Sequence, residues 1–240
     1  EESGESFMAQ LDRLLTHLKE NDGSDLHLAA GLKPRIRQKG RIRVLETEPE
    51  LDDAGLRGWL EEVAPARAWS EFEASHDLDF AYGIEGLARF RANYFVQNQG
   101  AAAVFRIIPE EIIPVEKLGL SPAISGLADL NQGLVLVTGP TGSGKSTTLA
   151  AIVDKLNKSY AKHVVTIEDP VEFVHRNQSS TFSHREVGLH TQGFAPALRS
   201  AIRQDADVIL VGEMRERETI SLAITAAEMG MLVFGTLHTN

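Results

Sequence analysis

A glycine-rich loop lies in this chain between an apolar segment and a helix-forming one, and few folds accommodate that arrangement. The apolar segment is Leu134-Val135-Leu136-Val137, and the helix-forming segment runs from Thr147 to Leu156. Between them lies the phosphate-loop pattern of glycine, four residues, glycine, lysine and serine. It is made by Gly139, Pro140, Thr141, Gly142, Ser143, Gly144, Lys145 and Ser146. This context, a buried strand followed by a helix, predicts an α/β nucleotide-binding domain.

The residue types of this loop suit the binding of phosphate. Its glycines allow a tight turn whose backbone N–H groups point at phosphate oxygens, and the helix N-terminus adds a partial positive charge. Lys145 is expected to neutralise the β- and γ-phosphates, and the Ser146 hydroxyl is expected to bind Mg²⁺. The loop therefore predicts a nucleoside triphosphate with Mg²⁺ as the cofactor.

Three further apolar segments resemble the strand before the loop. They are Val164-Val165-Thr166-Ile167, Val208-Ile209-Leu210-Val211 and Leu232-Val233-Phe234-Gly235, and helix-forming segments separate them. Strands that are apolar throughout are typical of a parallel sheet whose two faces are both covered by helices. We expect such a sheet from Gly133 onward.

Acidic residues follow two of these strands. Glu168 ends the second strand, and Glu213 comes two residues after the third. In parallel sheets these ends meet at the edge where ligands bind, so one carboxylate is expected to activate water and another to hold the metal. His238 ends the fourth strand, where a histidine could donate to the γ-phosphate.

The first half of the chain has a different pattern. Helical spacing is predicted from Phe7 to Leu18 and from Leu51 to Phe72, with alternating strands around them. Pro109, Pro114 and Pro122 then interrupt regular structure. We therefore predict a smaller α+β domain over residues 1–109 and the nucleotide-binding domain over residues 110–240.

Composition excludes some classes of protein. The net charge of −10 argues against broad attraction to nucleic acid or to an anionic membrane, and no cysteine is present for disulfides. The charge therefore predicts no nucleic-acid partner. No apolar run is long enough to span a bilayer, so direct membrane insertion is not expected either. The basic hairpin around Lys39 is expected to be a solvated or subunit-contacting face.

Several motifs together resemble the type II/IV secretion ATPase superfamily, and in particular its PilT-like pilus retraction branch. They are Ser24 to Gly31 with Pro34, Arg89-Phe90-Arg91 with Asn93, Gly139 to Thr147, Thr166 to His175, Arg185 to Gly188, Val211 to Arg215, and Gly235 to Thr239. The resemblance implies a PAS-like domain followed by a RecA-like P-loop ATPase domain. It further implies a homo-hexamer at the cytoplasmic face of the inner membrane, which works with the pilus platform protein and uses ATP to depolymerise the pilus.

The resemblance also implies roles for individual residues. Lys145, Ser146 and Thr147 match the Walker A box, and Glu168, Asp169 and Glu172 match the Asp box, with Glu168 as general base. Glu213 matches the Walker B box, with a role at the metal, and His238 matches the His box. Arg89, Arg91 and Arg106 match the region whose arginines approach the phosphates, a task that suits the guanidinium fork.

Three departures from the family pattern lead to further expectations. Met231 and His190 stand where the family usually has histidine and aspartate, and the two changes indicate either weakened turnover or a divergent paralogue. The sequence also stops just after Thr239, whereas the family continues through further helices with an Ala-Ile-Arg-Ala-Gly-Glu motif. We therefore expect a fragment or an incomplete ATPase domain.

Other functions stay open at this point. A pilus assembly or type II secretion ATPase is the alternative within the superfamily, although the Ser24 to Pro34 segment favours the retraction branch. A nucleic-acid translocase on the same core is another, since fold alone does not choose among motors. The third is a regulator that binds ATP without hydrolysing it.

Overall fold

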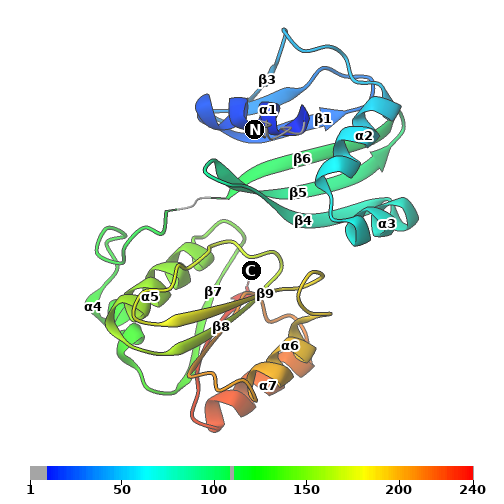
Figure 1. Cartoon of the computed structure of the whole chain (residues 1–240). Coiled ribbons are helices and arrows are strands. Elements are labelled where there is room, and N and C mark those ends of the chain that lie inside the picture. Colours follow the sequence, from blue (N-terminus) through cyan, green and yellow to red (C-terminus); the bar gives the residue numbers. More distant parts are fainter. Residues whose placement is uncertain (1–9, 109–110, 240) are drawn as a thin grey trace, which may run out of the picture. The chain divides into compact units, whose positions relative to one another are not determined.

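The chain consists of two compact units, Glu1–Pro109 and Glu110–Asn240. The computed structural model describes residues 10–108 and 111–239, and Figure 1 shows the helices and strands of both units. The division falls at the proline-containing segment, beside Glu110. Each unit has hydrophobic core clusters of its own.

The N-terminal unit is a six-stranded antiparallel sheet with three helices. Its strands are β1 (Gly23–Ala29), β2 (Arg35–Gln38), β3 (Arg41–Val44), β4 (Asp77–Ile84), β5 (Ala88–Gln97) and β6 (Gly100–Ile108), in the order β3-β2-β1-β6-β5-β4. The helices are α1 (Gln10–Glu20), α2 (Asp53–Val63) and α3 (Ala66–Ser75). The predicted α+β pattern of this half is therefore present.

The core of this unit lies between the helices and one face of the sheet. Leucines of α1 and α2, together with Trp69 and Phe72 of α3, pack against alternate residues of the strands, such as Phe90 and Tyr94. The helix predicted from Leu51 to Phe72 is two helices, because Pro65 interrupts the backbone pattern between them. Trp59 is only partly buried. Phe7 to Ala9 of the first predicted helix lie outside the described residues.

The C-terminal unit is built on a five-stranded parallel sheet. Its strands are β7 (Gly133–Gly139), β8 (His163–Glu168), β9 (Thr181–Glu186), β10 (Val208–Val211) and β11 (Leu232–His238), in the order β7-β11-β10-β8-β9. The helices are α4 (Pro122–Ser125), the 3₁₀ helix η1 (Gly126–Asp129), α5 (Lys145–Ser159), α6 (Phe194–Ala201) and α7 (Arg217–Glu228).

Helices cover both faces of this sheet, as Figure 1 shows. One core cluster joins α5 to alternate strand residues such as Leu210 and Phe234, and another joins α6 and α7 to the intervening residues, such as Ile209 and Val233. Each apolar strand thus packs on both sides, which is why its sequence shows no alternation. The predicted α/β class with a parallel sheet is confirmed.

Two strands differ from the sequence expectation. The first apolar strand is β7 at one edge of the described sheet, and Leu136 on it is 43% exposed. The other edge is β9, which was not predicted because Ser183, His184 and Arg185 make it polar. Edge strands have a neighbour on one side only, so they tolerate polar and exposed side chains.

Candidate functional site

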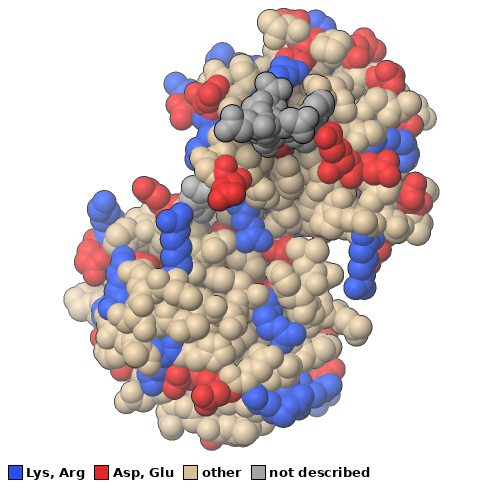
Figure 2. All heavy atoms as spheres, in the orientation of Figure 1, with Lys and Arg blue, Asp and Glu red and all other residues tan. Residues whose placement is uncertain are grey.

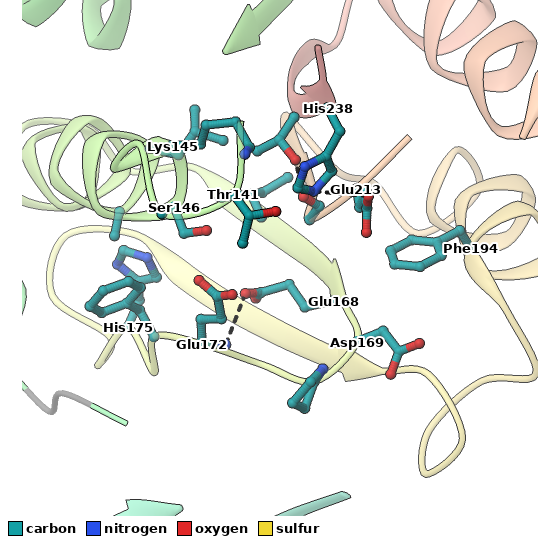
Figure 3. A pocket seen from close by; sticks show the side chains of 18 residues that line it. Thr141, Lys145, Ser146, Glu168, Asp169, Glu172, His175, Phe194, Glu213 and His238 are labelled. Atoms are coloured by element: carbon teal, nitrogen blue, oxygen red, sulfur yellow. Dashed lines mark hydrogen bonds and ion pairs between the residues drawn. The ribbon is translucent and has the colours of Figure 1, made fainter. Parts of the chain in front are cut away.

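The carboxyl ends of the parallel strands bring the predicted site residues of this unit into one pocket. It is lined by Thr141, Gly142, Lys145 and Ser146 of the phosphate loop and its helix, by Glu168, Asp169 and Glu172, and by Glu213 and His238. Figure 3 shows these side chains around a common space. Gly139, Pro140, Ser143, Gly144 and Thr147 belong to the loop or the start of its helix but do not line the pocket.

The phosphate loop has the backbone geometry that its glycines allow. Gly144 has φ of 90° directly before α5, and Gly139 has φ of 151°, values that side chains disfavour. A Cβ on Gly139 would also lie 2.7 Å from the Ser143 Oγ. The Lys145 ammonium donates to the carbonyls of Gly139 (3.0 Å) and Pro140 (2.9 Å). The lysine is therefore held within the loop at the start of its helix.

Glu168 lies on the face of the sheet that α5 covers. It follows Val164 and Thr166 by alternation along β8, and its side chain is buried. Its Oε2 accepts a hydrogen bond from the backbone N–H of Glu172 at 3.2 Å, drawn as a dashed line in Figure 3. This places the carboxylate on the same side of the sheet as the helix that begins at the phosphate loop.

Glu213 is in contact with two side chains, His238 and Arg215. Its Oε1 lies 3.0 Å from the Nε2 of His238 and accepts a hydrogen bond of 2.6 Å from the Nε of Arg215. The hydrogen bond to Glu213 raises the pKa of the Arg215 guanidinium. The hydroxyl of Thr236 donates to the carbonyl of Gly212 at 2.5 Å, and so ties β11 to the end of β10. The predicted Walker B and His-box residues are thus in direct contact.

The loop of residues 169–180 carries Asp169 and Glu172 and is held by buried polar side chains. The Glu186 carboxylate accepts from the N–H of Val171 at 3.0 Å. The amide of Asn157 donates to the carbonyl of Arg176 at 2.8 Å and accepts from the N–H of Gln178 at 3.2 Å. Sequence reasoning missed Asn157 and noted Glu186 only as part of the Arg185 to Gly188 motif, because the partners of both side chains are backbone groups that only the fold brings near.

His175 lines the same pocket and was noted in the sequence only as the end of a motif. Its ring stacks on Phe182 with centroids 4.9 Å apart and an angle of 13° between the planes. Burial, and to a smaller degree the nearby His184, lowers the pKa of His175 to about 4. The imidazole is therefore neutral at physiological pH.

The predicted arginines belong to the N-terminal unit. Arg91 of β5 and Arg106 of β6 lie directly opposite each other, and Arg89 shares the face of Arg91, away from Phe90. Arg91 pairs with Asp79 at 3.2 Å, and Arg106 pairs with Asp25 at 2.7 Å. Burial alone would raise the pKa of Asp25, but hydrogen bonds from Ser24 and Arg106 hold it below its ordinary value. An approach of these arginines to phosphate stays a prediction.

The two departures from the family pattern have defined places in the fold. Met231 directly precedes β11, at the opposite end of this strand from His238, and it packs against a core cluster. Seven strand residues span roughly 20 Å, so Met231 lies far from the pocket. The Nδ1 of His190 accepts from the backbone N–H of Glu186 at 3.0 Å, the kind of bond that an aspartate would also accept. Weakened turnover from either change stays a prediction.

No helix among residues 10–108 and 111–239 has the length and hydropathy needed to cross a membrane.

Comparison with known proteins places this geometry in a family. The model of the type II/IV secretion system protein family matches residues 2–240. The type IV pilus retraction ATPase PilT of Pseudomonas aeruginosa is 49% identical, over 96% of this chain and 67% of its own length. A twitching motility protein of Neisseria gonorrhoeae is 47% identical, over 86% of this chain and 55% of its own length.

A solved structure agrees with these sequence matches. The crystal structure of the pilus retraction motor PilT with bound ADP has a TM-score of 0.91 and 45% identity, and the match covers 95% of this chain and 66% of that one. This chain therefore spans between about half and two thirds of the length of these relatives. The predicted resemblance to pilus retraction ATPases is confirmed, and the chain belongs to the type II/IV secretion system protein family.

Proposed function

We propose that this chain is the nucleotide-binding part of an ATP-hydrolysing motor subunit that retracts type IV pili. One observation carries the proposal: the phosphate loop, Glu168, Glu213 and His238 line a single pocket at the carboxyl edge of a parallel sheet. The relatives named for retraction and twitching motility support the mechanical task, and the ADP of the PilT crystal structure supports nucleotide binding.

The residues of the pocket suit ATP hydrolysis with Mg²⁺. The Ser146 hydroxyl and the carboxylates of Glu168, Glu172 and Glu213 line the same pocket, and oxygen is the ligand atom that Mg²⁺ prefers. Within residues 10–108 and 111–239, no three acidic, histidine or cysteine side chains are gathered closely enough to hold a metal ion by themselves, so the phosphates would supply further ligands. We assign Ser146 and Glu213 to the metal, which when bound neutralises phosphate charge. Lys145 would exchange its bonds to loop carbonyls for phosphate oxygens.

Glu168 is the proposed general base. It would orient the attacking water and accept its proton, and burial of the carboxylate limits competition from bulk solvent. His238 would donate to the γ-phosphate while its contact with Glu213 links that position to the end of β10. Asp169 and Glu172 would position the loop that closes this side of the pocket.

The larger assembly follows from the family. We propose a PAS-like N-terminal domain, a RecA-like C-terminal domain and a homo-hexamer in which Arg89, Arg91 and Arg106 stabilise phosphate charge. Its partner would be the platform protein of the pilus machine, at the cytoplasmic side of the inner membrane. ATP-driven changes between the two domains would then drive the removal of pilin subunits.

The alternatives have less support. Both of the relatives described above have names tied to retraction or twitching motility, which favours this branch over assembly or type II secretion. A nucleic-acid translocase would need a surface that attracts phosphate. On the face shown in Figure 2, Lys and Arg side chains are interspersed with Asp and Glu. The presence of both Glu168 and Glu213 in the pocket argues against a regulator that binds ATP without hydrolysing it.

The test is the ATPase rate of the full chain with Mg²⁺, in the presence and absence of single-stranded DNA. We expect hydrolysis that DNA does not stimulate, that a chelator abolishes, and that Lys145→Ala abolishes through loss of nucleotide binding. Lys117→Ala is the matched control, because Lys117 is exposed and does not line the pocket. Stimulation by DNA would favour the translocase, and binding without turnover would favour the regulator.

A further inference from the structure

Two arginines lie side by side on the sheet of the N-terminal unit, on the face opposite to its helical core. Arg106 of β6 is directly opposite Arg91 of β5, and Asp25 of β1 is directly opposite Arg106 on its other side. Their strand neighbours, such as Leu26 and Phe105, pack in the core with the helices, so the three charged side chains face away from it. Like charges directly opposite each other repel, so a pair of arginines in this position needs compensating carboxylates.

Each of the two guanidinium groups is anchored through its Nε. The Nε of Arg106 donates to the Oδ1 of Asp25 at 2.7 Å, and the Nε of Arg91 donates to the Oδ1 of Asp79 at 3.2 Å. Asp79 is held in turn by the amide of Asn93, which donates to its Oδ2 at 3.1 Å. Within residues 10–108 and 111–239, the terminal nitrogens of both arginines form no hydrogen bond.

The outer ends of both arginines are therefore open to a ligand. The side chain of Arg106 is 69% exposed, and that of Arg91 is 47% exposed. The two terminal nitrogens of a guanidinium form the fork that binds a carboxylate or a phosphate through parallel hydrogen bonds. Anchoring through the Nε fixes the direction of this fork without using it.

Asp25 is itself fixed. It is buried, and its Oδ2 accepts from the hydroxyl of Ser24 at 2.7 Å and lies 3.8 Å from the Nε of Arg37. Burial alone would raise its pKa, but the hydrogen bonds from Ser24 and Arg106 lower it, so the side chain is a carboxylate at physiological pH. A buried carboxylate is costly unless it is paired, and this holds Arg106 against it.

The arrangement suits a ligand that carries several anionic oxygens. A single carboxylate would occupy one fork, whereas the phosphate chain of a nucleotide offers oxygens to both. We propose that Asp25 and Asp79 are positioning residues, which orient Arg106 and Arg91 as a pair whose terminal nitrogens bind phosphate oxygens of the nucleotide. The inference rests on the proposed function, which assigns these arginines to phosphate charge, and adds to it the carboxylates that direct them.

The first experiment is a double-mutant cycle on kcat/KM for ATP hydrolysis by the full chain. Asp25→Asn keeps the shape of the side chain and an acceptor for the Arg106 Nε, but removes the charge. We expect it to lower kcat/KM by about 10-fold, because a neutral acceptor holds the guanidinium less firmly than a carboxylate does. In the Arg106→Ala background no guanidinium is left to orient, so the same substitution should cause no further loss.

Asp77→Asn is the matched control. Asp77 begins β4 at an exposed position, and its carboxylate forms no ion pair in the part of the chain that the structure describes. We expect this substitution to leave kcat/KM unchanged. An equal loss from Asp25→Asn with and without Arg106 would overturn the proposal, because Asp25 would then act through the stability of its unit. Wild-type kcat/KM in Asp25→Asn would overturn it as well.

Asp79→Asn repeats the test without changing a buried group. Asp79 is exposed, so its substitution should leave folding intact. We expect it to lower kcat/KM in the presence of Arg91 and to have no effect in the Arg91→Ala background. A loss that persists without Arg91 would contradict the positioning role of Asp79.

A spectroscopic measurement does not depend on turnover. We expect the ¹⁵N resonance of the Arg106 guanidinium to shift when a non-hydrolysable ATP analogue is added to the wild-type protein, and to shift less in Asp25→Asn. An analogue that binds without moving this resonance would overturn the proposal. Wild-type protein that binds the analogue but does not hydrolyse ATP would contradict the motor function, and the resonance would still decide the role of Asp25.

Discussion

At the scale of single residues, Gly212 sets how closely two carboxylate-bearing strand ends approach. Its N–H donates to the carbonyl of Ile167 at 2.8 Å. A Cβ at this position would lie 3.2 Å from the Cγ of Glu168 and 3.3 Å from both its Cα and the Ile167 carbonyl oxygen. A side chain here would crowd its neighbours without straining the backbone, since the φ of Gly212 is not in the left-handed region. The position of Glu168 therefore depends on the lack of a side chain at Gly212, directly after β10.

Gly212→Ala should accordingly displace Glu168 while the phosphate loop remains intact. We expect ADP affinity near that of wild type and a lower ATPase rate, because the neighbours of the new Cβ must shift by a few tenths of an ångström and catalysis is sensitive to the position of its groups. The measurements are steady-state hydrolysis and calorimetric binding. Gly58→Ala is the control, since a Cβ there meets nothing within 4 Å. Normal turnover in Gly212→Ala would show that Glu168 tolerates the crowding.

The sequence predicted those pocket residues that stand next to strong local patterns. Lys145 follows a glycine-rich loop, and Glu168 and His238 end apolar strands, so their positions at one sheet edge could be inferred. Asn157 carries no such mark, because it is a single polar residue within a helix, and Glu186 was noted only as part of the Arg185 to Gly188 motif, without a role. Their roles depend on backbone groups at least 15 positions away along the chain.

At the scale of elements, the loop of residues 169–180 joins the chemistry of β8 to the helix α5. Glu168 and Glu186 hold its start through the N–H groups of Glu172 and Val171. Asn157, near the end of α5, holds its later part through three backbone groups, those of Arg176, Gln178 and Ser180. The loop is therefore fixed at both ends by side chains of regular elements, which is how Glu172 and His175 reach the pocket.

Asn157→Ala should release the second half of this loop. Because buried partners are left unpaired, we expect the free energy of unfolding of the C-terminal unit to fall by about 1–3 kcal/mol. The affinity for ADP with Mg²⁺ should fall as well. Urea denaturation followed by circular dichroism measures the first, and calorimetry the second. Asn131→Ala, at an exposed position, should change neither; equal effects of both substitutions would contradict the account of the loop.

The errors at this scale have physical causes. The edge strand β9 was missed because its polar residues hide the alternation of Phe182, His184 and Glu186 on one face. The prediction of one long helix from Leu51 was wrong, because the helical backbone is interrupted at Pro65. The helical spacing of apolar residues continues across this break. Periodicity reports which residues can pack together, and not always where an element ends.

At the scale of the whole molecule, the two units have separate cores. In the N-terminal unit, α1, α2 and α3 cover one sheet face with a core of leucines and aromatic rings. In the C-terminal unit, two clusters lie on opposite faces of the parallel sheet. In the sequence, the prolines from Pro109 onward had indicated a boundary at the same place. The PAS-like and RecA-like assignments stay predictions.

Separate cores predict that residues 1–109 fold without the rest of the chain. We expect the isolated N-terminal unit to show mixed helix and strand signals in circular dichroism and a cooperative thermal transition, as single domains of this size do. Leu60→Ala truncates a fully buried side chain, so it should lower the free energy of unfolding by about 2–5 kcal/mol. The midpoint temperature of the transition should fall accordingly. A gradual, non-cooperative melt of the isolated unit would contradict independent folding.

ATP hydrolysis in the pocket is proposed to need Glu168 as the base. Glu168→Gln separates this role from nucleotide binding, because the amide keeps the size and part of the hydrogen bonding of the carboxylate and cannot accept the proton. Glu228→Gln, at an exposed position outside the pocket, is the control. We predict that Glu168→Gln binds ATP like wild type and hydrolyses it about 100- to 10,000-fold more slowly in single-turnover assays. Wild-type hydrolysis in this variant would contradict the claim.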